Sequence, residues 1–181
     1  MGLAALHLRR GDLERAEAAV SHVLALESAR LEIIDHLQIR SSAALVAVHA
    51  GRDAEAREQA RRALEAAVQL PAYVTEFIAQ LTWLMEVLVL LWQRAAAAGS
   101  PDVHELEQQA RMVCQLGLKK VRRLPVMEPD SCYWLGECEW LAGHPKKART
   151  LWLRAAARAQ ALDLPYQRAL AERALLRGAA S

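Results

Sequence analysis

The chain has 181 residues, of which 54% are apolar and 24% are charged, with eight glycines and six prolines. This composition excludes extensive disorder and argues against a turn-rich all-β fold. The 23 basic and 21 acidic side chains give a formal net charge of +2, which gives little support to nucleic-acid binding, because neutralising phosphates favours a basic face of one sign.

The first expected helix is short and covers about residues 3–10. Gly11 follows it, and Asp12 is placed to cap a second helix that runs to about Glu27. Because the first helix has only about two turns, we expect the chain to begin partway through a longer array and to be a fragment of a larger protein.

The next two helices are expected over about 29–50 and from Asp53 to Pro71. The second of these carries alanines at steps of four, three and four residues: Ala56, Ala60, Ala63 and Ala67. This spacing places them on one side of a helix, so another helix can approach that side closely.

Residues 72–98 are the most apolar stretch of the chain. A transmembrane helix needs about 20 nearly uninterrupted apolar residues, and six polar residues interrupt this one: Glu76, Gln80, Thr82, Glu86, Gln93 and Arg94. We therefore expect a buried central helix and no membrane partner.

Glu86 stands among apolar neighbours in this stretch. A buried carboxylate has a raised pKa and is a candidate for a functional site. Charged side chains are rarely buried completely, so we expect Glu86 to point to a groove or to water.

A sixth helix is expected over about 102–123, with Gly117 as a weak point. Pro125 and Pro129 then predict an extended link over 124–129, because prolines oppose regular helix. Three further helices are expected over about 130–142, 145–163 and 165–177, and the last should cap the open end of the fold.

Glycines mark four of the expected turns, at intervals of 40, 48 and 44 residues: Gly11, Gly51, Gly99 and Gly143. Small residues lie seven positions before and five positions after three of them, as the pairs Ala4 with Ala16, Ala44 with Ala56, and Gly136 with Ala148. Two helices joined by a tight turn would touch at these pairs, and periods of this size indicate stacked helical hairpins.

The hairpin at Gly99 departs from the pattern. Its turn is two residues longer, with Ser100 and Pro101 as candidates for the insertion, and its expected contact pair is large, Trp92 with Leu106. We expect this hairpin to be splayed or shifted in register.

These residues resemble the tetratricopeptide-like superfamily, which places a small residue in each helix around a glycine turn. The segment 119–175 is similar to the elongated repeats of bacterial signal-transduction ATPases and multidomain adenylate cyclases, through Trp134-Leu135-Gly136, Leu141-Ala142-Gly143, Lys147-Ala148 and Ala161-Leu162-Asp163-Leu164-Pro165-Tyr166. In those proteins the residue at Asp163 is often glycine and that at Leu164 often methionine.

The resemblance implies an all-α, right-handed superhelical solenoid of about four antiparallel helical hairpins in one domain over 1–181. The repeats would cover approximately 1–28, 29–70, 72–124 and 130–163, with a capping helix over 165–178. The ATPase and cyclase catalytic modules of the similar proteins have no counterpart in this chain.

The sequence displays no catalytic constellation, and we expect neither a catalytic residue nor a cofactor. No phosphate-binding glycine-rich loop occurs. Cys132, Cys138 and His144 are spaced by six residues, which turns each about 120° from the last on a helix, whereas zinc ligands must converge. The other five histidines are interpreted as scattered surface or packing residues: His7, His22, His36, His49 and His104.

Aromatic residues on the first helices of the hairpins would line the inner surface of a superhelix, where they serve as peptide anchors, although packing in the core is the favoured explanation of most aromatic residues. The candidate partner-binding residues are Tyr73, Glu76, Gln80 and Trp83 on one hairpin, and Tyr133, Glu137 and Trp140 on another. The basic cluster at 119–123 is interpreted as a solvated helix end, with an anion or acidic-partner site as the alternative.

The leading hypothesis is a non-catalytic protein–protein interaction scaffold, as a regulatory or sensor segment of a larger signalling protein. Its partners would be a protein or peptide segment and neighbouring domains of the same polypeptide. The alternative is a small-molecule or peptide sensor with a pocket near Trp83 and Glu86. The chain has only three cysteines, and charged residues in its first 19 positions argue against a signal peptide, so we expect a cytoplasmic protein. The excess of 19 arginines over four lysines leads us to expect a bacterial origin.

Overall fold

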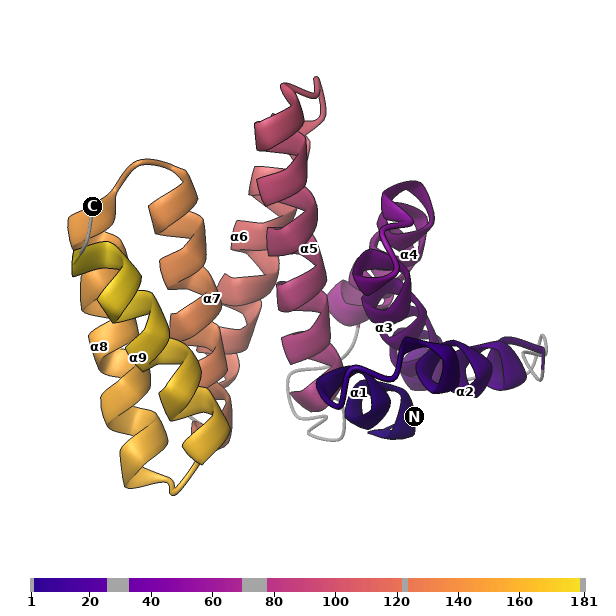
Figure 1. Ribbon diagram of the computed structural model, residues 1–181, viewed down its shortest axis with the longest axis horizontal. Coiled ribbons are helices and arrows are strands. Elements are labelled where there is room, and N and C mark those ends of the chain that lie inside the picture. Colours follow the sequence, from indigo (N-terminus) through magenta and orange to yellow (C-terminus); the bar gives the residue numbers. More distant parts are fainter. Residues whose placement is uncertain (1, 26–32, 70–77, 122–123, 180–181) are drawn as a thin grey trace. The chain divides into compact units, whose positions relative to one another are not determined.

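A computed structural model describes residues 2–25, 33–69, 78–121 and 124–179. All regular structure in these ranges is helical, which confirms the all-α prediction (Figure 1). The elements are α1 (Gly2–Arg9), α2 (Leu13–Ala25), α3 (Ile33–His49), α4 (Asp53–Gln69), α5 (Ile78–Ala98), α6 (Val103–Lys120), the 3₁₀ turn η1 (Pro125–Met127), α7 (Glu128–Leu141), α8 (Pro145–Ala161) and α9 (Pro165–Ala179).

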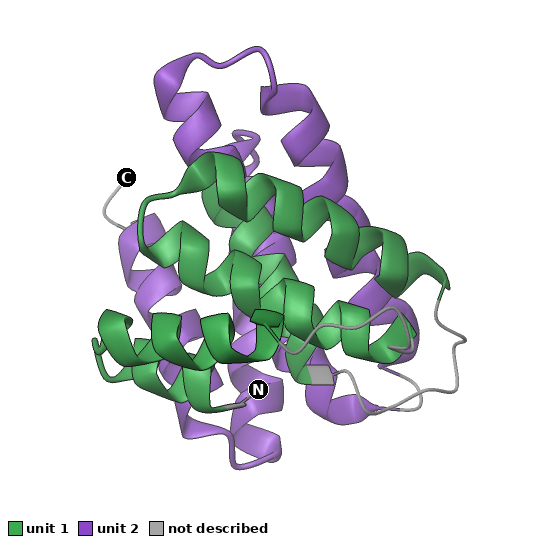
Figure 2. Ribbon diagram, turned by 90° about the vertical axis from the view of Figure 1, so that its right-hand side faces the viewer, with its two compact units in different colours: residues 1–91 green, residues 92–181 purple. Residues whose placement is uncertain are grey.

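The chain forms two compact units, residues 1–91 and 92–181 (Figure 2). The first holds α1 to α4 and the greater part of α5. The second holds the end of α5, then α6, η1 and α7 to α9. Within the first unit α3 packs along α4 and α2 packs on α1 and α3; within the second, α7 packs against α6, α8 and α9.

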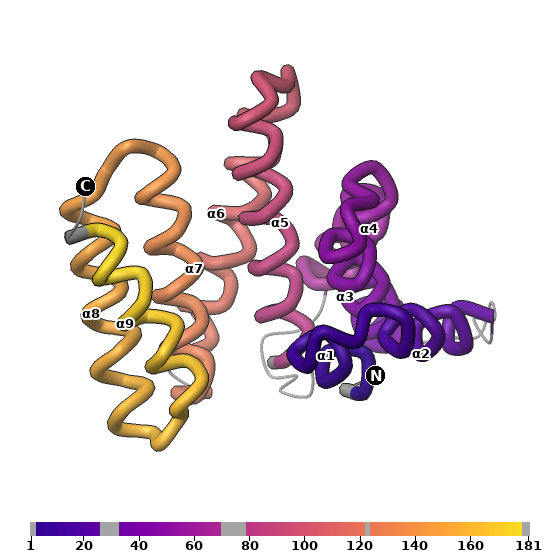
Figure 3. Tube along the Cα trace, in the orientation of Figure 1, coloured from indigo at the N-terminus to yellow at the C-terminus, as the bar shows by residue number. Residues whose placement is uncertain are grey.

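The predicted glycine turns share one backbone geometry. The tube in Figure 3 shows the path of the chain from helix to helix through these turns. Gly11, Gly51, Gly99 and Gly143 have φ between 63° and 77°, a left-handed conformation that glycine adopts without steric cost. At Gly51 the glycine N–H donates to the carbonyl of Val48, and the next N–H, of Arg52, donates to Ala47. This pair of bonds satisfies the last carbonyls of a helix and stops it.

A fifth turn repeats this geometry at Asp163. Its φ is 53°, its N–H donates to the carbonyl of Gln160 at 3.2 Å, and the N–H of Leu164 donates to Ala159 at 2.8 Å. The turn joins α8 to α9, which pack against each other. Helix α9 therefore forms a hairpin with α8.

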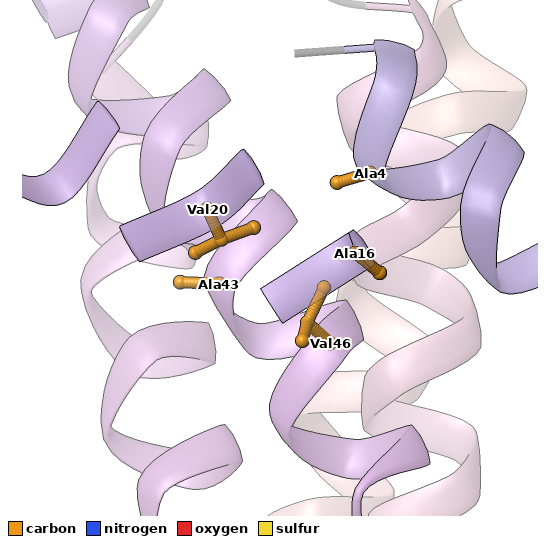
Figure 4. Close-up of a cluster of buried hydrophobic side chains, with 5 residues drawn as sticks. All are labelled: Ala4, Ala16, Val20, Ala43 and Val46. Atoms are coloured by element: carbon orange, nitrogen blue, oxygen red, sulfur yellow. The ribbon is translucent and has the colours of Figure 1, made fainter. Parts of the chain in front are cut away.

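The alanine side of α4 is buried as predicted. Ala56, Ala60 and Ala63 are fully buried, and so is Ala44 on the facing helix α3. In the first hairpins, Ala4 and Ala16 belong to one buried cluster with Val20, Ala43 and Val46. Figure 4 shows Val20 of α2 lying over Ala43 of α3, so these small side chains let the helices cross closely.

Gly136 on α7 marks a close approach to α8. A Cβ atom at this position would lie 3.3 Å from the carbonyl oxygen of Ala148 and 2.5 Å from Cδ1 of Trp152. The predicted neighbourhood of Gly136 and Ala148 is confirmed. The indole of Trp152, which is fully buried, fills the space that a side chain at Gly136 would need.

The predicted extended link before α7 is wrong. Residues 125–127 form a 3₁₀ turn, and α7 begins at Glu128 with Pro129 in its first turn. The first N–H groups of a helix have no partner within it, so a proline there removes no helical bond. In α6 the helix also continues through Gly117, which is buried.

Helix α5 is long and apolar enough to cross a membrane by length and composition alone, with a mean hydropathy of 1.2 over residues 79–98. Within the described structure 61% of that window is buried, which is the pattern of a core helix. Leu81, Leu84, Met85 and Leu88 have no exposed surface.

Candidate functional site

The candidate partner-binding residues near α5 are placed only in part. Tyr73 and Glu76 lie outside the described residues. Gln80 is 7% exposed, and its side-chain oxygen has no hydrogen-bond partner in the described part of the chain. Trp83 is half-buried, so part of its ring remains accessible.

The second candidate group lies on α7 beneath α9. Tyr133 packs against two buried clusters that contain Ala171 and Ala174 of α9. Trp140 packs on the second of these clusters and lies 5.6 Å from Trp152, centroid to centroid. The face of α7 that was expected to line a groove therefore supports the last helix of the chain.

Arg177 of α9 connects this face to Glu137. Its Nη2 donates to both carboxylate oxygens of Glu137, at 2.7 and 2.9 Å. The same guanidinium lies 5.5 Å from the ring centroid of Trp140 and 5.2 Å from that of Trp152, within the range of cation–π attraction. Burial raises the pKa of Glu137, and Arg177 opposes that rise only in part.

Among the described residues of the first unit, the most deeply buried carboxylate is that of Glu86, which is 3% exposed. Arg9 of α1 donates from Nη1 and Nη2 to its two oxygens, at 3.2 and 2.5 Å. His49 of α3 places Nε2 2.9 Å from the same carboxylate. Because an ionised carboxylate only accepts hydrogen bonds, this contact requires the proton on Nε2. The carboxylate of Glu86 on α5 therefore links α5 to α1 and α3.

The expectation that Glu86 faces a groove or water is wrong, whereas His49 lies at the surface as expected and also contacts Glu86. Burial alone would raise the pKa of Glu86, but the hydrogen bonds from His49 and Arg9 outweigh burial and hold that pKa below its ordinary value. In the sequence, His49 lies 37 positions from Glu86 and Arg9 lies 77 positions from it. No local sequence signal connects positions so far apart.

Two further carboxylates of the second unit are bound in the same way. Glu128 accepts hydrogen bonds from Arg154 and Arg158, one turn apart on α8. Glu139 of α7 accepts from Arg111 of α6 and from His144. Burial opposes ionisation at both, but these bonds hold the pKa of each carboxyl below its ordinary value. The acidic groups therefore join neighbouring helices.

The cysteines offer no activated nucleophile. Cys114, Cys132 and Cys138 are free thiols without exposed surface. Burial raises the pKa of Cys132 to about 11, and burial together with the neighbouring Cys138 raises that of Cys114. Since the thiolate is the reactive form, Cys114 and Cys132 are unreactive at neutral pH. No group of three or more metal-ligating side chains gathers among the residues of known placement.

No protein-family model matches this chain, and no curated protein is significantly similar to it.

Proposed function

We propose that the chain is a non-catalytic helical-repeat scaffold that binds a protein or peptide segment, as a regulatory part of a larger cytoplasmic signalling protein. The observation that carries the proposal is the recurrence of one helix-ending turn at five places along the chain. A repeated turn that joins packed helices is typical of solenoids, whose stacked hairpins present long surfaces to partners. A right-handed, tetratricopeptide-like superhelix belongs to this proposal.

The chemistry of the buried acids supports a non-catalytic role. General acid–base catalysis needs a group whose proton is free to move to a substrate. Glu86, Glu128 and Glu139 instead accept hydrogen bonds from arginine and histidine side chains, and their lowered pKa values keep them ionised. Charges held in this way fix helix positions, which a binding scaffold requires.

The test uses the intact chain with a photo-crosslinking residue in place of Ala79, an exposed position one turn before Trp83 on α5. Crosslinked proteins are identified, purified and titrated against the chain. The proposal expects a saturable complex with a fixed stoichiometry. Trp83→Ala should weaken that complex at least fivefold, whereas Met112→Ala, which truncates another accessible apolar residue, should not. A chain that binds no protein but turns over a small molecule would overturn the proposal.

A small-molecule sensor is the second candidate, because a cavity of about 530 Å³ lies between α3 and α4. This volume falls within the range of ligand pockets. His36, Arg40 and Arg62 line it together with Glu65, so an anionic metabolite fits its chemistry. In a thermal-shift screen a single metabolite that raises the unfolding midpoint by several degrees would favour the sensor, since ligands stabilise the native state.

A further inference from the structure

Although the net charge of the whole chain is small, the two compact units have formal net charges of opposite sign. Residues 1–91 contain nine basic and twelve acidic side chains, whereas residues 92–181 contain fourteen basic and nine acidic ones. The excess is concentrated in α8, which has five basic residues and no acidic residue. A partner of the second unit is therefore favoured if it is acidic.

The basic residues of α8 differ in how they are used. Arg154 and Arg158 bind Glu128. Lys146 and Arg149 are exposed and have neither a hydrogen-bond nor an ion-pair partner within the described ranges, although most other charged side chains of the unit do. Two cations on consecutive turns of one helix face are thus left available for an external anion.

These two cations border a pocket of about 180 Å³ between α8 and α9. Pro145, Trp152 and Leu175 supply its apolar wall, and Gly178 completes it. Gly178 has no side chain to cover the ring edge of Trp152, since a Cβ there would lie 3.2 Å from Cζ3. The pocket therefore combines a small apolar floor with a cationic rim.

We propose that this pocket binds the carboxylate of an acidic residue that stands beside an aliphatic residue in a partner peptide. The carboxylate would accept charge-assisted hydrogen bonds from Lys146 and Arg149. The aliphatic side chain would pack on Pro145 and Leu175, the accessible apolar residues of the pocket. This inference rests on the proposed function, because it names the chemistry of the partner that the scaffold would hold.

The geometry disfavours a nucleic acid as the occupant. Single-stranded nucleic acids bind along extended basic grooves with their bases stacked on exposed aromatic faces. Trp152 is fully buried and offers only an edge, and the volume of the pocket holds one side chain rather than a nucleotide. A free phosphate would satisfy the cations but would leave the apolar floor uncovered.

The experiment titrates the full chain with a fluorescent peptide that has a Glu-Leu-Glu core flanked by glycines, at 0.15 M salt. Analogues with Gln-Leu-Gln and Glu-Gly-Glu cores test the carboxylates and the aliphatic side chain separately. Inorganic phosphate and a ten-nucleotide thymidine oligonucleotide serve as competitors. The Nε–H resonance of Arg149 reports binding at the pocket directly.

Two double variants each remove two positive charges. One removes them at the pocket and the other removes them outside it. Lys146→Gln with Arg149→Gln should weaken peptide binding at least tenfold, because both donors to the carboxylate are lost. Lys147→Gln with Arg173→Gln removes two exposed charges from the same two helices outside the pocket, and should change the affinity less than twofold, since distant charges are screened by salt. Circular dichroism confirms that both variants are folded.

The inference is overturned if no binding is detected at 1 mM peptide, or if both double variants weaken binding equally. It is also overturned if phosphate or the oligonucleotide displaces the labelled peptide at a lower concentration than unlabelled peptide does. Its failure is distinct from failure of the proposed function. A crosslinked protein partner that binds the Lys146→Gln, Arg149→Gln chain with unchanged affinity leaves the scaffold intact and refutes only this pocket.

Discussion

His49 and Glu86 lie 37 positions apart in the chain, yet Nε2 of the histidine is 2.9 Å from a carboxylate oxygen of the glutamate. Arg9 binds the same carboxylate from α1. The helices of the first unit are therefore tied together by one buried negative charge as well as by apolar packing.

Removing that charge should destabilise the chain. Glu86→Gln keeps the size of the side chain but leaves Arg9 and His49 without an ionised partner, so we expect the free energy of unfolding to fall by about 2–3 kcal/mol, at the lower end for a broken buried pair because both partners are partly exposed. Urea unfolding measures the loss. Glu65→Gln, at an exposed pair with Arg61, is the matched control, and an equal effect there would contradict the prediction.

The stabilisation by Glu86 should depend on pH. Its pKa is lower in the folded chain than the ordinary value of 4.5, so the unfolded chain binds more protons between these two values and stability rises with pH there. The difference in unfolding free energy between the parent and Glu86→Gln should be full at pH 6–7 and should shrink as the pH falls below about 4.5. A difference that grows toward acid would refute the assignment.

Gly136→Ala should overpack the contact between α7 and α8. The added methyl group would lie 2.5 Å from Cδ1 of Trp152, and we expect the free energy of unfolding to fall by about 2–3 kcal/mol because the fully buried indole would have to shift. Trp152→Phe replaces the indole with a smaller ring that can move aside, so the double variant should lose less than the sum of the two single variants. Strict additivity, measured by urea unfolding, would show that the two positions do not interact.

The turn at Asp163 should be improved by glycine. A left-handed φ of 53° strains a residue that has a Cβ atom, so Asp163→Gly should raise the unfolding free energy by about 0.5–1 kcal/mol. Gln160→Gly, three residues earlier in exposed helix, should instead lower it by about 1 kcal/mol. Thermal unfolding distinguishes the two signs. A loss at both positions would mean that the turn carries no strain.

Arg177 should hold α9 in place. Arg177→Ala leaves Glu137 buried and unpaired, so amide hydrogen exchange in α9 should speed up at least tenfold while exchange in α3 stays unchanged. Adding Glu137→Gln removes the unpaired charge and should restore part of the protection. If amide protection in α9 is identical in the parent and in Arg177→Ala, then the packing of Ala171 and Ala174 is sufficient to hold α9 in place without Arg177.

The all-helical character of the chain and most of its turns could be predicted from the sequence, because their signals are local. Helix periodicity placed Ala56 and Ala60 on the buried side of α4, and glycine marked the turns because only a left-handed residue can end these helices in this way. The errors were local as well. Proline at 129 suggested an interruption where its position in the first turn of α7 makes it compatible with helix.

The candidate site depended on information that the sequence does not carry locally. Spacing identified Glu137 and Trp140 as neighbours on one face of α7, but only the packing of α9 shows that Arg177 covers them. The sequence by itself determined that the chain is helical, which side of α4 is apolar and where the glycine turns lie. Tertiary structure alone decided that Glu86 meets Arg9 and His49, because such pairing depends on how whole helices pack, across separations that no periodic pattern spans.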